Sequence, residues 1–455
     1  DLITFGVNDR TRAYNYASNG AIIPLTDYYH SDLGAAFFKR CESIGLDPEA
    51  ILKEASLVDG HVYGSIYRDD NYANYYSLRA FINKTWLDKL GLQAPTTSQE
   101  LYDVLVAFRD GDPNGNGQKD EIPMMGQEQN SWQSEPLAYI QNMFIYFNDN
   151  ETYVLPLSET GGVLDVAYDK EAYREFLKYA NKLVADGLLD ETSFTQDGTT
   201  YNALKRSDPA VIGIAVTGGA VDLYFGNSPD EYVPFEVCAG PDGVQWQTAS
   251  RSDAGIRTAI TADCEHPEIA FMLTQYVYND DASMEWFYIH RWGEQNVDWR
   301  FAQEGEEGMF SAFGYKPNLL QLQNTWGVMT DKHWQGVELM NNVCYAPEIM
   351  EVFAGSTSND EYQYAQNYGL NRSHAPSFDD LLPALNYTQE ETDQWTDART
   401  ALTTYVRESR VRFAMGQMDP NSDADWEAYL NELNVLQYKD ILAVDQAAYE
   451  RMFGK

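Results

Sequence analysis

Short apolar runs that suit β-strands alternate with amphipathic stretches that suit α-helices along most of the chain. The strand-like runs occur at residues 2–5, 20–25, 62–66, 211–216 and 256–261. Alternation of these two kinds of segment is typical of α/β folds, in which helices cover a sheet. The sequence therefore predicts an α/β protein.

The clearest predicted helix begins after Thr97. Thr97 and Glu100 have the spacing of a capping box, in which each side chain accepts a hydrogen bond from the backbone N–H of the other residue. The apolar residues that follow recur on one helical face: Leu101, Val104, Leu105 and Phe108. A further helix is expected from Pro267, with Ala270, Leu273 and Val277 facing the core.

The length and the lack of a linker bear on the domain organisation. A chain of 455 residues suffices for two or three domains. No change in composition marks a linker between them, so we expect domains that exchange chain with one another. No apolar run approaches the roughly 20 residues that a membrane-spanning helix needs.

The net charge limits the partners that the protein can bind, and the spacing of the cysteines limits their possible disulfides. There are 31 basic against 70 acidic residues, a net charge of −39, and such a field repels nucleic acids and anionic membrane surfaces. The cysteines are far apart and form no CxxC pair, so they are either buried single thiols or include one disulfide. They are Cys41, Cys238, Cys264 and Cys344.

The sharpest motif is the stretch 112–121, which reads DPNGNGQKDE. Oxygen-bearing side chains alternate along it, and Gly117 stands where a calcium loop must turn sharply. Position 12 of an EF-hand would be Pro123, so the bidentate acid has to come from an earlier residue. The predicted calcium ligands are Asp112, Asn114, Asn116, the carbonyl of Gln118, Asp120 and Glu121. The alternative is an acidic turn that binds nothing.

Signatures of catalysis are missing. The chain contains no HExxH, no GxSxG and no Walker-type loop, and its six histidines lack the spacing of zinc ligands. Pairs of carboxylates could hydrolyse glycosides, but among 70 acidic residues such pairs arise by chance. We therefore expect a protein that is not an enzyme.

Several tryptophans lie in polar surroundings. Trp132 stands in the stretch QNSWQS, where an exposed ring suits the C–H face of a sugar, and the alternative is a half-buried packing residue. Trp292 and Trp326 also have polar neighbours. Each is a candidate ligand contact.

Several motifs together resemble the maltose-type (family 1) extracellular solute-binding proteins of ABC sugar importers. The segment 1–10 and the DGHVYG strand at 59–64 are similar to the early part of these proteins. The stretch 81–97 reads FINKTWLDKLGLQAPTT and is similar to their "YNKDWLDKLGLxxPTT" segment. The loop 112–123 and the segments 259–268 and 292–299 resemble the large calcium-containing oligosaccharide-binding lipoproteins.

The resemblance implies a two-lobed, hinged fold of the periplasmic-binding-protein type (type II) with interleaved lobes. It places 1–77 plus 262–325 in the N-terminal lobe and 78–261 plus 326–455 in the C-terminal lobe. The family's first strand and helix, and a lipid anchor to the cell membrane, would precede residue 1. Crossovers between the lobes are expected near 77–81 and 253–261.

The resemblance also implies a function. The protein would be an extracellular or periplasmic monomer that binds oligosaccharide in an interlobe cleft and delivers it to the permease subunits of an ABC importer. The candidate ligand contacts are Asp9, Arg10, Tyr75, Trp132, Trp292 and Trp326, although Asp9 and Arg10 could instead simply pair with each other. The alternatives are a secreted carbohydrate-active enzyme, such as a lyase or glycosidase, or a surface glycan adhesin.

Overall fold

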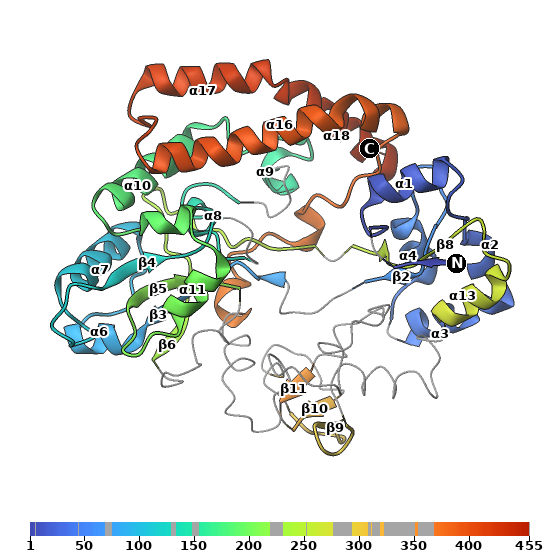
Figure 1. Cartoon of the computed structure of the whole chain (residues 1–455), viewed down its shortest axis with the longest axis horizontal. Coiled ribbons are helices and arrows are strands. Elements are labelled where there is room, and N and C mark those ends of the chain that lie inside the picture. The colour runs from blue at the N-terminus through green and yellow to red at the C-terminus, as the bar shows by residue number, and fades with distance from the viewer. Residues whose placement is uncertain are drawn as a thin grey trace.

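The computed structural model describes most of the chain and shows two lobes and a small separate sheet (Figure 1). The described residues are 1–4, 6–43, 45–68, 75–128, 133–147, 154–218, 231–251, 253–275, 294–307, 311, 319–322, 351–353 and 368–454. The separate sheet has the order β11–β10–β9 and consists of β9 (Trp299–Phe301), β10 (Leu319–Gln321) and β11 (Glu351–Phe353).

The N-terminal lobe, at the right of Figure 1, combines the first part of the chain with a later segment that returns to it. Two antiparallel pairs join these parts: β1 (Leu2–Ile3) with β8 (Ala259–Ile260), and β2 (Ile66–Tyr67) with β7 (Gly255–Ile256). The helices of this lobe are α1 (Arg10–Ser18), α2 (Thr26–Tyr29), α3 (Ala35–Ser43), α4 (Pro48–Ala55) and α13 (Pro267–Gln275). Both parts of the chain contribute side chains to one buried apolar cluster.

The C-terminal lobe contains a mixed sheet in the order β4–β5–β3–β6. Its strands are β3 (Ala80–Asn83), β4 (Ile122–Met125), β5 (Ile212–Val216) and β6 (Tyr232–Phe235). β4 and β5 are parallel, whereas β3 runs antiparallel to both of its neighbours. The helices around the sheet are α6 (Lys84–Leu90), α7 (Ser98–Asp110), α8 (Pro136–Gln141), α9 (Leu157–Thr160), α10 (Glu171–Ala185) and α11 (Gly198–Lys205).

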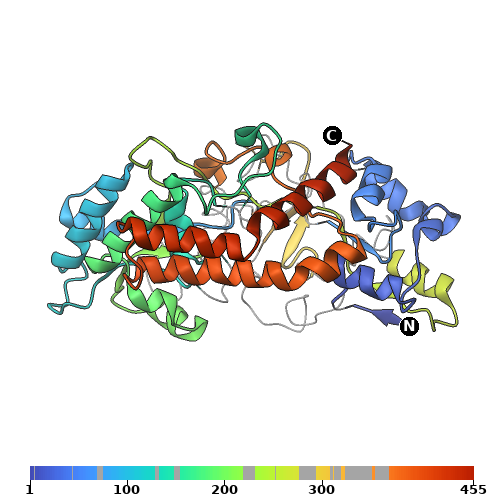
Figure 2. The same cartoon turned by 90° about the horizontal axis from the view of Figure 1, so that it is seen from above.

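Three C-terminal helices complete this lobe and extend toward the other one. They are α16 (Gln389–Ala414), α17 (Asp423–Val435) and α18 (Tyr438–Phe453). α16 packs against α10 and α18 and also contacts α1 of the N-terminal lobe, and Figure 2 shows it running between the two. The long helices thus bridge both lobes on one side of the molecule. None of the described helices has both the length and the apolar content that crossing a bilayer requires.

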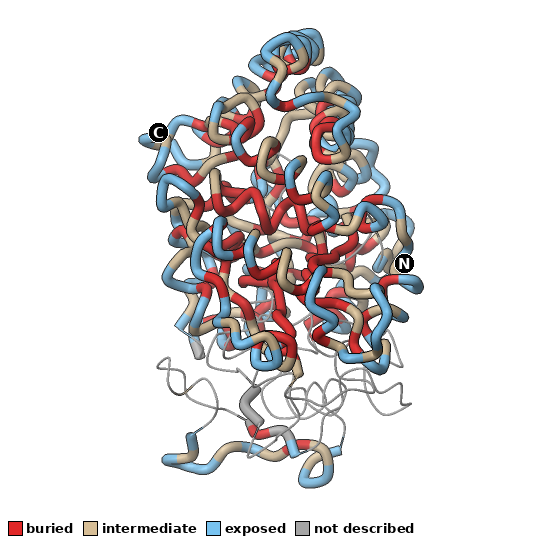
Figure 3. The backbone as a smooth tube through the Cα atoms, turned by 90° about the vertical axis from the view of Figure 1, so that its left-hand side faces the viewer, coloured by how far each residue is buried: buried red, intermediate tan, exposed pale blue. Residues whose placement is uncertain are grey.

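Local sequence signals explain the best-predicted elements. The capping box of Thr97 and Glu100 forms as expected at the start of α7, and the four predicted apolar residues of this helix are buried. β5 also confirms the strand expected at 211–216. The run at 20–25 forms no strand, and there only Ile22 bridges to Thr261. Figure 3 shows the buried positions gathered inside the molecule, with exposed positions on its outer turns.

The expected inward face of α13 is wrong in part. Leu273 is 49 % exposed, and the buried residues of this helix are Phe271, Thr274 and Gln275. Val277 lies outside the described residues. The structure shows no disulfide among Cys41, Cys238 and Cys264, and Cys344 lies outside the described residues. The choice between single thiols and one disulfide that includes Cys344 therefore stays a prediction.

Three segments of chain pass between the lobes, and we call them together the interlobe joint: residues 75–79, 247–251 and 374–386. The backbone N–H of Ser250 donates to the carbonyl of Tyr75 at 2.8 Å, so the first two segments lie side by side. The backbone N–H of Gln247 donates to the carbonyl of His374 at 2.9 Å, which attaches the third segment. Such hydrogen-bonded crossing segments suit a hinge.

The position of the second crossing differs from the boundary expected at residue 261. Ala254, Ile256 and Ile260 are buried in the cluster of the N-terminal lobe, because β7 and β8 pair with β2 and β1. The chain therefore enters the N-terminal lobe by residue 254. The other lobe boundaries remain a prediction.

Gly213 on β5 provides a test of how closely helix and sheet pack. A Cβ atom added there would lie 2.3 Å from Cδ2 of Phe108 on α7 and 2.7 Å from the carbonyl oxygen of Pro123. We expect Gly213→Ala to lower the free energy of unfolding by about 1–3 kcal/mol, as overpacking does. Urea denaturation measures this. Gly255→Ala is the matched control, since a Cβ there meets no atom within 4 Å, and equal effects of the two substitutions would contradict the packing.

Candidate ligand-binding site

Buried polar side chains gather where two parallel strands of the C-terminal lobe end. Gln127 and Ser134 follow β4 and are each 4 % exposed, and Thr217 follows β5 and is 3 % exposed. The backbone N–H of Gln127 donates to the carbonyl of Ser134 at 2.8 Å, so these two residues lie side by side. Open α/β sheets bind ligands outside the carboxyl ends of their strands. We call this group of residues the sheet-edge rim.

Two buried cations also belong to the rim. Arg79, which precedes the antiparallel β3, donates from its guanidinium to the carbonyl of Gly218. Lys205, at the end of α11, has its Nζ 3.5 Å from Oγ1 of Thr217 and 4.6 Å from the centre of the Tyr201 ring. In a chain with a net charge of −39, these side chains give the rim a locally positive character.

The described residues also form a cavity beside the interlobe joint, which we call the junction cavity. Its volume is about 620 Å³, within the range of small-molecule sites. α4, the second crossing segment, the third crossing segment and the end of α18 all contribute to its walls. Two of the six candidate ligand residues, Arg10 and Tyr75, line it.

The guanidinium of Arg10 donates hydrogen bonds to four acceptors within the protein. Its Nη2 atom donates to the carbonyls of Glu54 at 2.6 Å and Ala254 at 2.8 Å. Its Nη1 atom donates to the carbonyl of Ser56 at 3.2 Å and to Oδ1 of Asn386 at 3.0 Å. Two of these carbonyls lie at the C-terminal end of α4, where a helix lacks internal donors and favours a cation. Arg10 therefore joins the end of α4 to Ala254, which follows the second crossing segment, and to Asn386 of the third crossing segment.

Asp9 has a local role in this structure. Its carboxylate accepts from the backbone N–H of Arg12 at 2.7 Å and so caps the N-terminus of α1. Among the described residues, no ion pair joins Asp9 to Arg10, so the alternative that the two simply pair is wrong. Asp9 is exposed, and its contact with a ligand stays a prediction.

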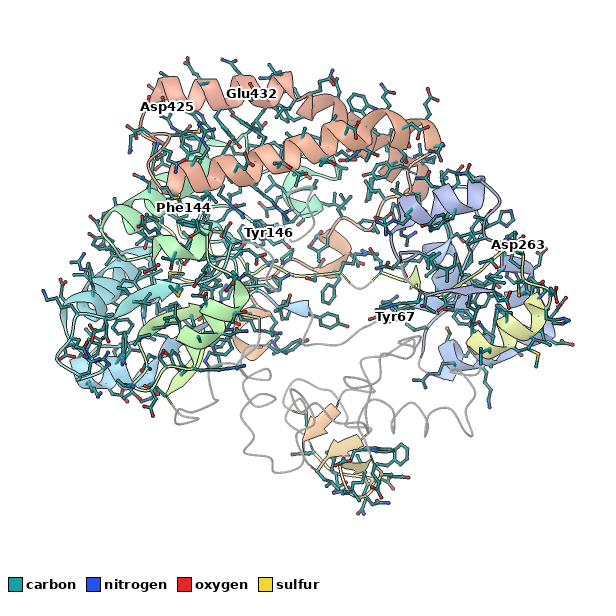
Figure 4. All side chains as sticks on the ribbon, viewed as in Figure 1. Tyr67, Phe144, Tyr146, Asp263, Asp425 and Glu432 are labelled. Atoms are coloured by element: carbon teal, nitrogen blue, oxygen red, sulfur yellow. The ribbon has the colours of Figure 1, made fainter. Side chains whose placement is uncertain are left out.

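Tyr75 is buried among aromatic neighbours at the joint. Its ring centre lies 4.8 Å from that of Phe378, and the adjacent Tyr76 lies 5.4 Å from Tyr368. Tyr146 of the C-terminal lobe, labelled in Figure 4, belongs to the same apolar cluster. Trp132, Trp292 and Trp326 lie outside the described residues.

The predicted calcium loop forms a compact turn. Asp112 accepts from the backbone N–H groups of Gly115 at 3.1 Å and Gly117 at 3.2 Å. Asn114 and Asn116 donate from their side-chain amides to Asp120, each at 2.9 Å, and these bonds hold the pKa of Asp120 below its ordinary value. No group of three or more His, Cys, Asp or Glu in the described part of the chain is arranged as a metal site.

The surroundings of Glu121 in this loop fit a bound cation. Oε1 of Glu121 is buried and has no hydrogen-bond partner within the described structure. Burial and the charges of Asp120 and Asp112 raise the pKa of Glu121, so negative charge is concentrated around this carboxyl group. A hard cation such as Ca²⁺ would satisfy this oxygen and offset the repulsion.

The sequence did not reveal the rim residues Arg79, Lys205 and Thr217. Thr217 could have been found, because it directly follows a strongly apolar strand. Arg79 and Lys205 carried no such signal, since nothing in their local pattern shows that they meet at one edge of a sheet.

The fold and the site define a class: the chain has the two-lobed fold of solute-binding proteins. No family model matches the chain. It is similar to the fructooligosaccharide ABC transporter substrate-binding protein FusA of Streptococcus pneumoniae, with 24 % identity over 96 % of this chain and 77 % of that protein. These findings confirm the resemblance to the solute-binding proteins of ABC sugar importers.

Solved structures agree with this fold over the whole chain. FusA in complex with kestose has a TM-score of 0.73 and 22 % identity, covering 100 % of this chain and 88 % of that one. A structure of a FusA "EF-hand mutant" has a TM-score of 0.74 and 21 % identity over the same shares. An "HMO binding" ABC-transporter associated solute-binding protein of Bifidobacterium longum infantis has a TM-score of 0.73 and 21 % identity, covering 97 % of this chain and 86 % of that one.

A shorter match concerns a lipoprotein. Lipoprotein LipO of Bacillus subtilis is 31 % identical over 39 % of this chain and 32 % of its own length. This match covers only part of each protein, so the whole-chain similarity comes from FusA.

The contribution of Arg10 to the stability of the interlobe joint can be tested. We expect Arg10→Ala to lower the free energy of unfolding by about 3 kcal/mol or more, because four hydrogen-bond acceptors lose a charged donor. Urea denaturation at neutral pH measures the change. Arg12→Ala, at an exposed position of the same helix, should change it by less than about 0.5 kcal/mol. An Arg10→Ala protein as stable as the parent would contradict this role.

Proposed function

We propose that this chain is a non-enzymatic, monomeric component of an ABC importer. It binds an oligosaccharide between its two lobes and delivers it unchanged to the permease subunits. The observation that supports this most is the agreement of its fold, over the whole chain, with FusA bound to kestose. The name of the related FusA protein refers to fructooligosaccharides, so these sugars are the first candidates.

The geometry suits a sugar held between two lobes. The sheet-edge rim offers a buried amide, two hydroxyls and two cations at the carboxyl ends of β4 and β5. The interlobe joint provides crossing segments about which the lobes can close. A ligand that touches both lobes favours the closed form, since only that form makes both sets of contacts.

The runner-up function, a glycosidase or lyase, has weaker support. Two carboxyl groups of the junction cavity, those of Glu54 and Asp253, already pair with Arg68 and Arg251. A glycosidase needs one carboxyl group that can protonate the leaving group and a second that can act on the sugar or on a water. Carboxylates held in ion pairs suit neither role.

We also propose where the protein works. A lipid-anchored position on the extracellular or periplasmic side suits an importer's binding protein, and the partial match to Lipoprotein LipO supports it. The acidic surface is compatible with this placement, provided that the anchor, and not the bulk of the protein, meets the membrane.

Binding can be tested with defined sugars. Titration calorimetry against kestose, longer fructooligosaccharides and uronate oligosaccharides should find at least one ligand, and chromatography should recover that sugar unchanged. We expect Trp132→Ala to weaken its binding by about 2 kcal/mol, roughly thirtyfold in Kd, because an aromatic platform for a sugar face is lost.

Tyr16→Ala is the control for this experiment, since Tyr16 is an exposed aromatic residue on α1. Its Kd should match that of the parent. Shortened sugar products would favour the enzyme instead. Equal binding by the parent and Trp132→Ala would remove Trp132 from the ligand site.

We further propose a structural calcium ion in the loop 112–121. Asp112, Asn114, Asn116, the carbonyl of Gln118, Asp120 and Glu121 would hold it. The buried, unpartnered Oε1 of Glu121 supports the assignment, and so does the EF-hand named for FusA. The ion would neutralise the repulsion among the three carboxylates and fix the connection from α7 to β4.

Chelation tests this ion. At a free calcium concentration of a hundred times Kd, binding adds roughly 2.7 kcal/mol to the free energy of unfolding, and a calcium chelator should remove it. Thermal melting measures the loss. Asp120→Ala should melt at the same temperature with and without chelator, whereas Asp242→Ala, an exposed acid elsewhere, should respond like the parent. A parent protein indifferent to chelator would rule the ion out.

A further inference from the structure

A buried ion pair joins the long helix α16 to the chain just after β4, next to the sheet-edge rim. Glu128 directly follows the rim residue Gln127, and its side chain is 3 % exposed. Arg410 lies in the C-terminal half of α16, and its side chain is 4 % exposed. Nη2 of Arg410 donates a hydrogen bond to Oε1 of Glu128. Both charged groups are therefore almost completely removed from water and depend on each other.

Glu128 also fixes the two segments that carry the rim residues Gln127 and Ser134. Its backbone N–H donates to the carbonyl of Ser193 at 2.8 Å. Its Oε2 atom accepts from the backbone N–H of Leu137 at 3.4 Å, in the first turn of α8, where such groups have no partner within the helix. One residue therefore attaches the segment that follows β4 to the start of α8, close to Ser134 in the chain.

Arg410 connects this arrangement to the interlobe joint. Its guanidinium lies 5.5 Å from the centre of the Phe147 ring, within the range of a cation–π contact. The carbonyl of Phe147 accepts from Oγ1 of Thr248 at 2.9 Å, and Thr248 belongs to the second crossing segment. α16 itself contacts α1 of the N-terminal lobe. Arg410 thus touches both the residue that supports the rim and a residue that is hydrogen-bonded to the joint.

Arg410 is the main group that favours the charged form of Glu128. Burial raises the pKa of Glu128, and the charge of Arg410 opposes this rise, together with the N–H of Leu137 and the charge of Arg407. Arg407 is exposed, so water and salt screen its charge. Without Arg410, Glu128 would be a buried acid that no buried cation compensates in the described part of the chain.

Stability alone gives little reason for such a pair. The cost of removing two charges from water offsets much of their attraction, and apolar residues of similar volume often stabilise a fold equally well. A guanidinium differs from an apolar side chain because it donates along fixed directions in one plane. A pair of this kind therefore suits the placement of its neighbours more than the stability of the fold.

We propose that Arg410 and Glu128 are positioning residues of the sugar site, which hold the ends of β4 and α8 so that Gln127 and Ser134 keep the geometry that a sugar requires. They act through these rim residues and link the rim to α16. This inference rests on the proposed function, because it concerns the same sugar.

Hydrogen–deuterium exchange of the ligand-free protein tests the positioning without any sugar. Arg410→Met keeps the length of the side chain and removes its charge. The amides of Gln127, Glu128 and Leu137 should then exchange faster by about tenfold or more, because a buried charge has lost its partner. The amides of β5 should keep the parent's rates. A loss of global stability would instead accelerate the exchange of β5 as well.

A second substitution tests whether Arg410 acts through Glu128. In the double variant Arg410→Met/Glu128→Gln no charge is buried, and the glutamine oxygen still accepts from the N–H of Leu137. Its rim amides should return toward the parent's exchange rates. Arg412→Met is the matched control, since it removes the same charge from an exposed position of α16 and should leave the exchange unchanged.

Calorimetry with kestose then measures the effect on binding. Arg410→Met should raise the Kd by about tenfold or more, the double variant should lie between it and the parent, and Arg412→Met should match the parent. If the parent does not bind kestose, this sugar assignment fails and the exchange rates alone decide the positioning.

Three results would overturn the proposal. They are unchanged exchange of the rim amides in Arg410→Met, an acceleration that β5 shares equally, and faster rim exchange with an unchanged Kd for kestose. If Arg410→Met does not fold, Arg410→Lys takes its place, because lysine keeps the charge but lacks the planar set of donors. The same differences from the parent are then expected at a smaller size, and their absence would count against the positioning role.

Discussion

The pairing of strands that are far apart in the sequence is the constraint on which the rest of this structure depends. β7 and β8 pair with β2 and β1, so the chain must return to the N-terminal lobe after it has built the sheet of the other lobe. Residues 374–386, which precede α16, contact both lobes as well. Neither lobe can form its core from one continuous stretch, and the interlobe joint is the direct consequence.

The joint concentrates charge where backbone groups from both lobes come together. Arg10 offsets the loss of water around its guanidinium with carbonyls from the end of α4 and from Ala254. Glu54 and Asp253 offset theirs by pairing with Arg68 and Arg251. These contacts leave the joint hydrogen-bonded and not merely packed.

Features that depend on neighbouring residues could be predicted from the sequence. The capping box at Thr97 formed because its partners are three residues apart, and the loop 112–121 folded on its own side chains. The α/β class and the two-lobed fold were also predictable, since several motifs along the chain resemble one family. The run at 20–25 was less informative, because an apolar run becomes a strand only where a partner strand lies beside it.

The sequence by itself determined the helices with strong local signals, the acidic character and the class of protein. Only the tertiary structure decided which side of α13 is buried, that Arg10 hydrogen-bonds to distant segments, and that Glu54 and Asp253 line one cavity. The physical reason is the same in each case. These properties depend on contacts between segments that are distant along the chain, and local patterns of hydrophobic and polar residues carry no information about which distant segments become neighbours.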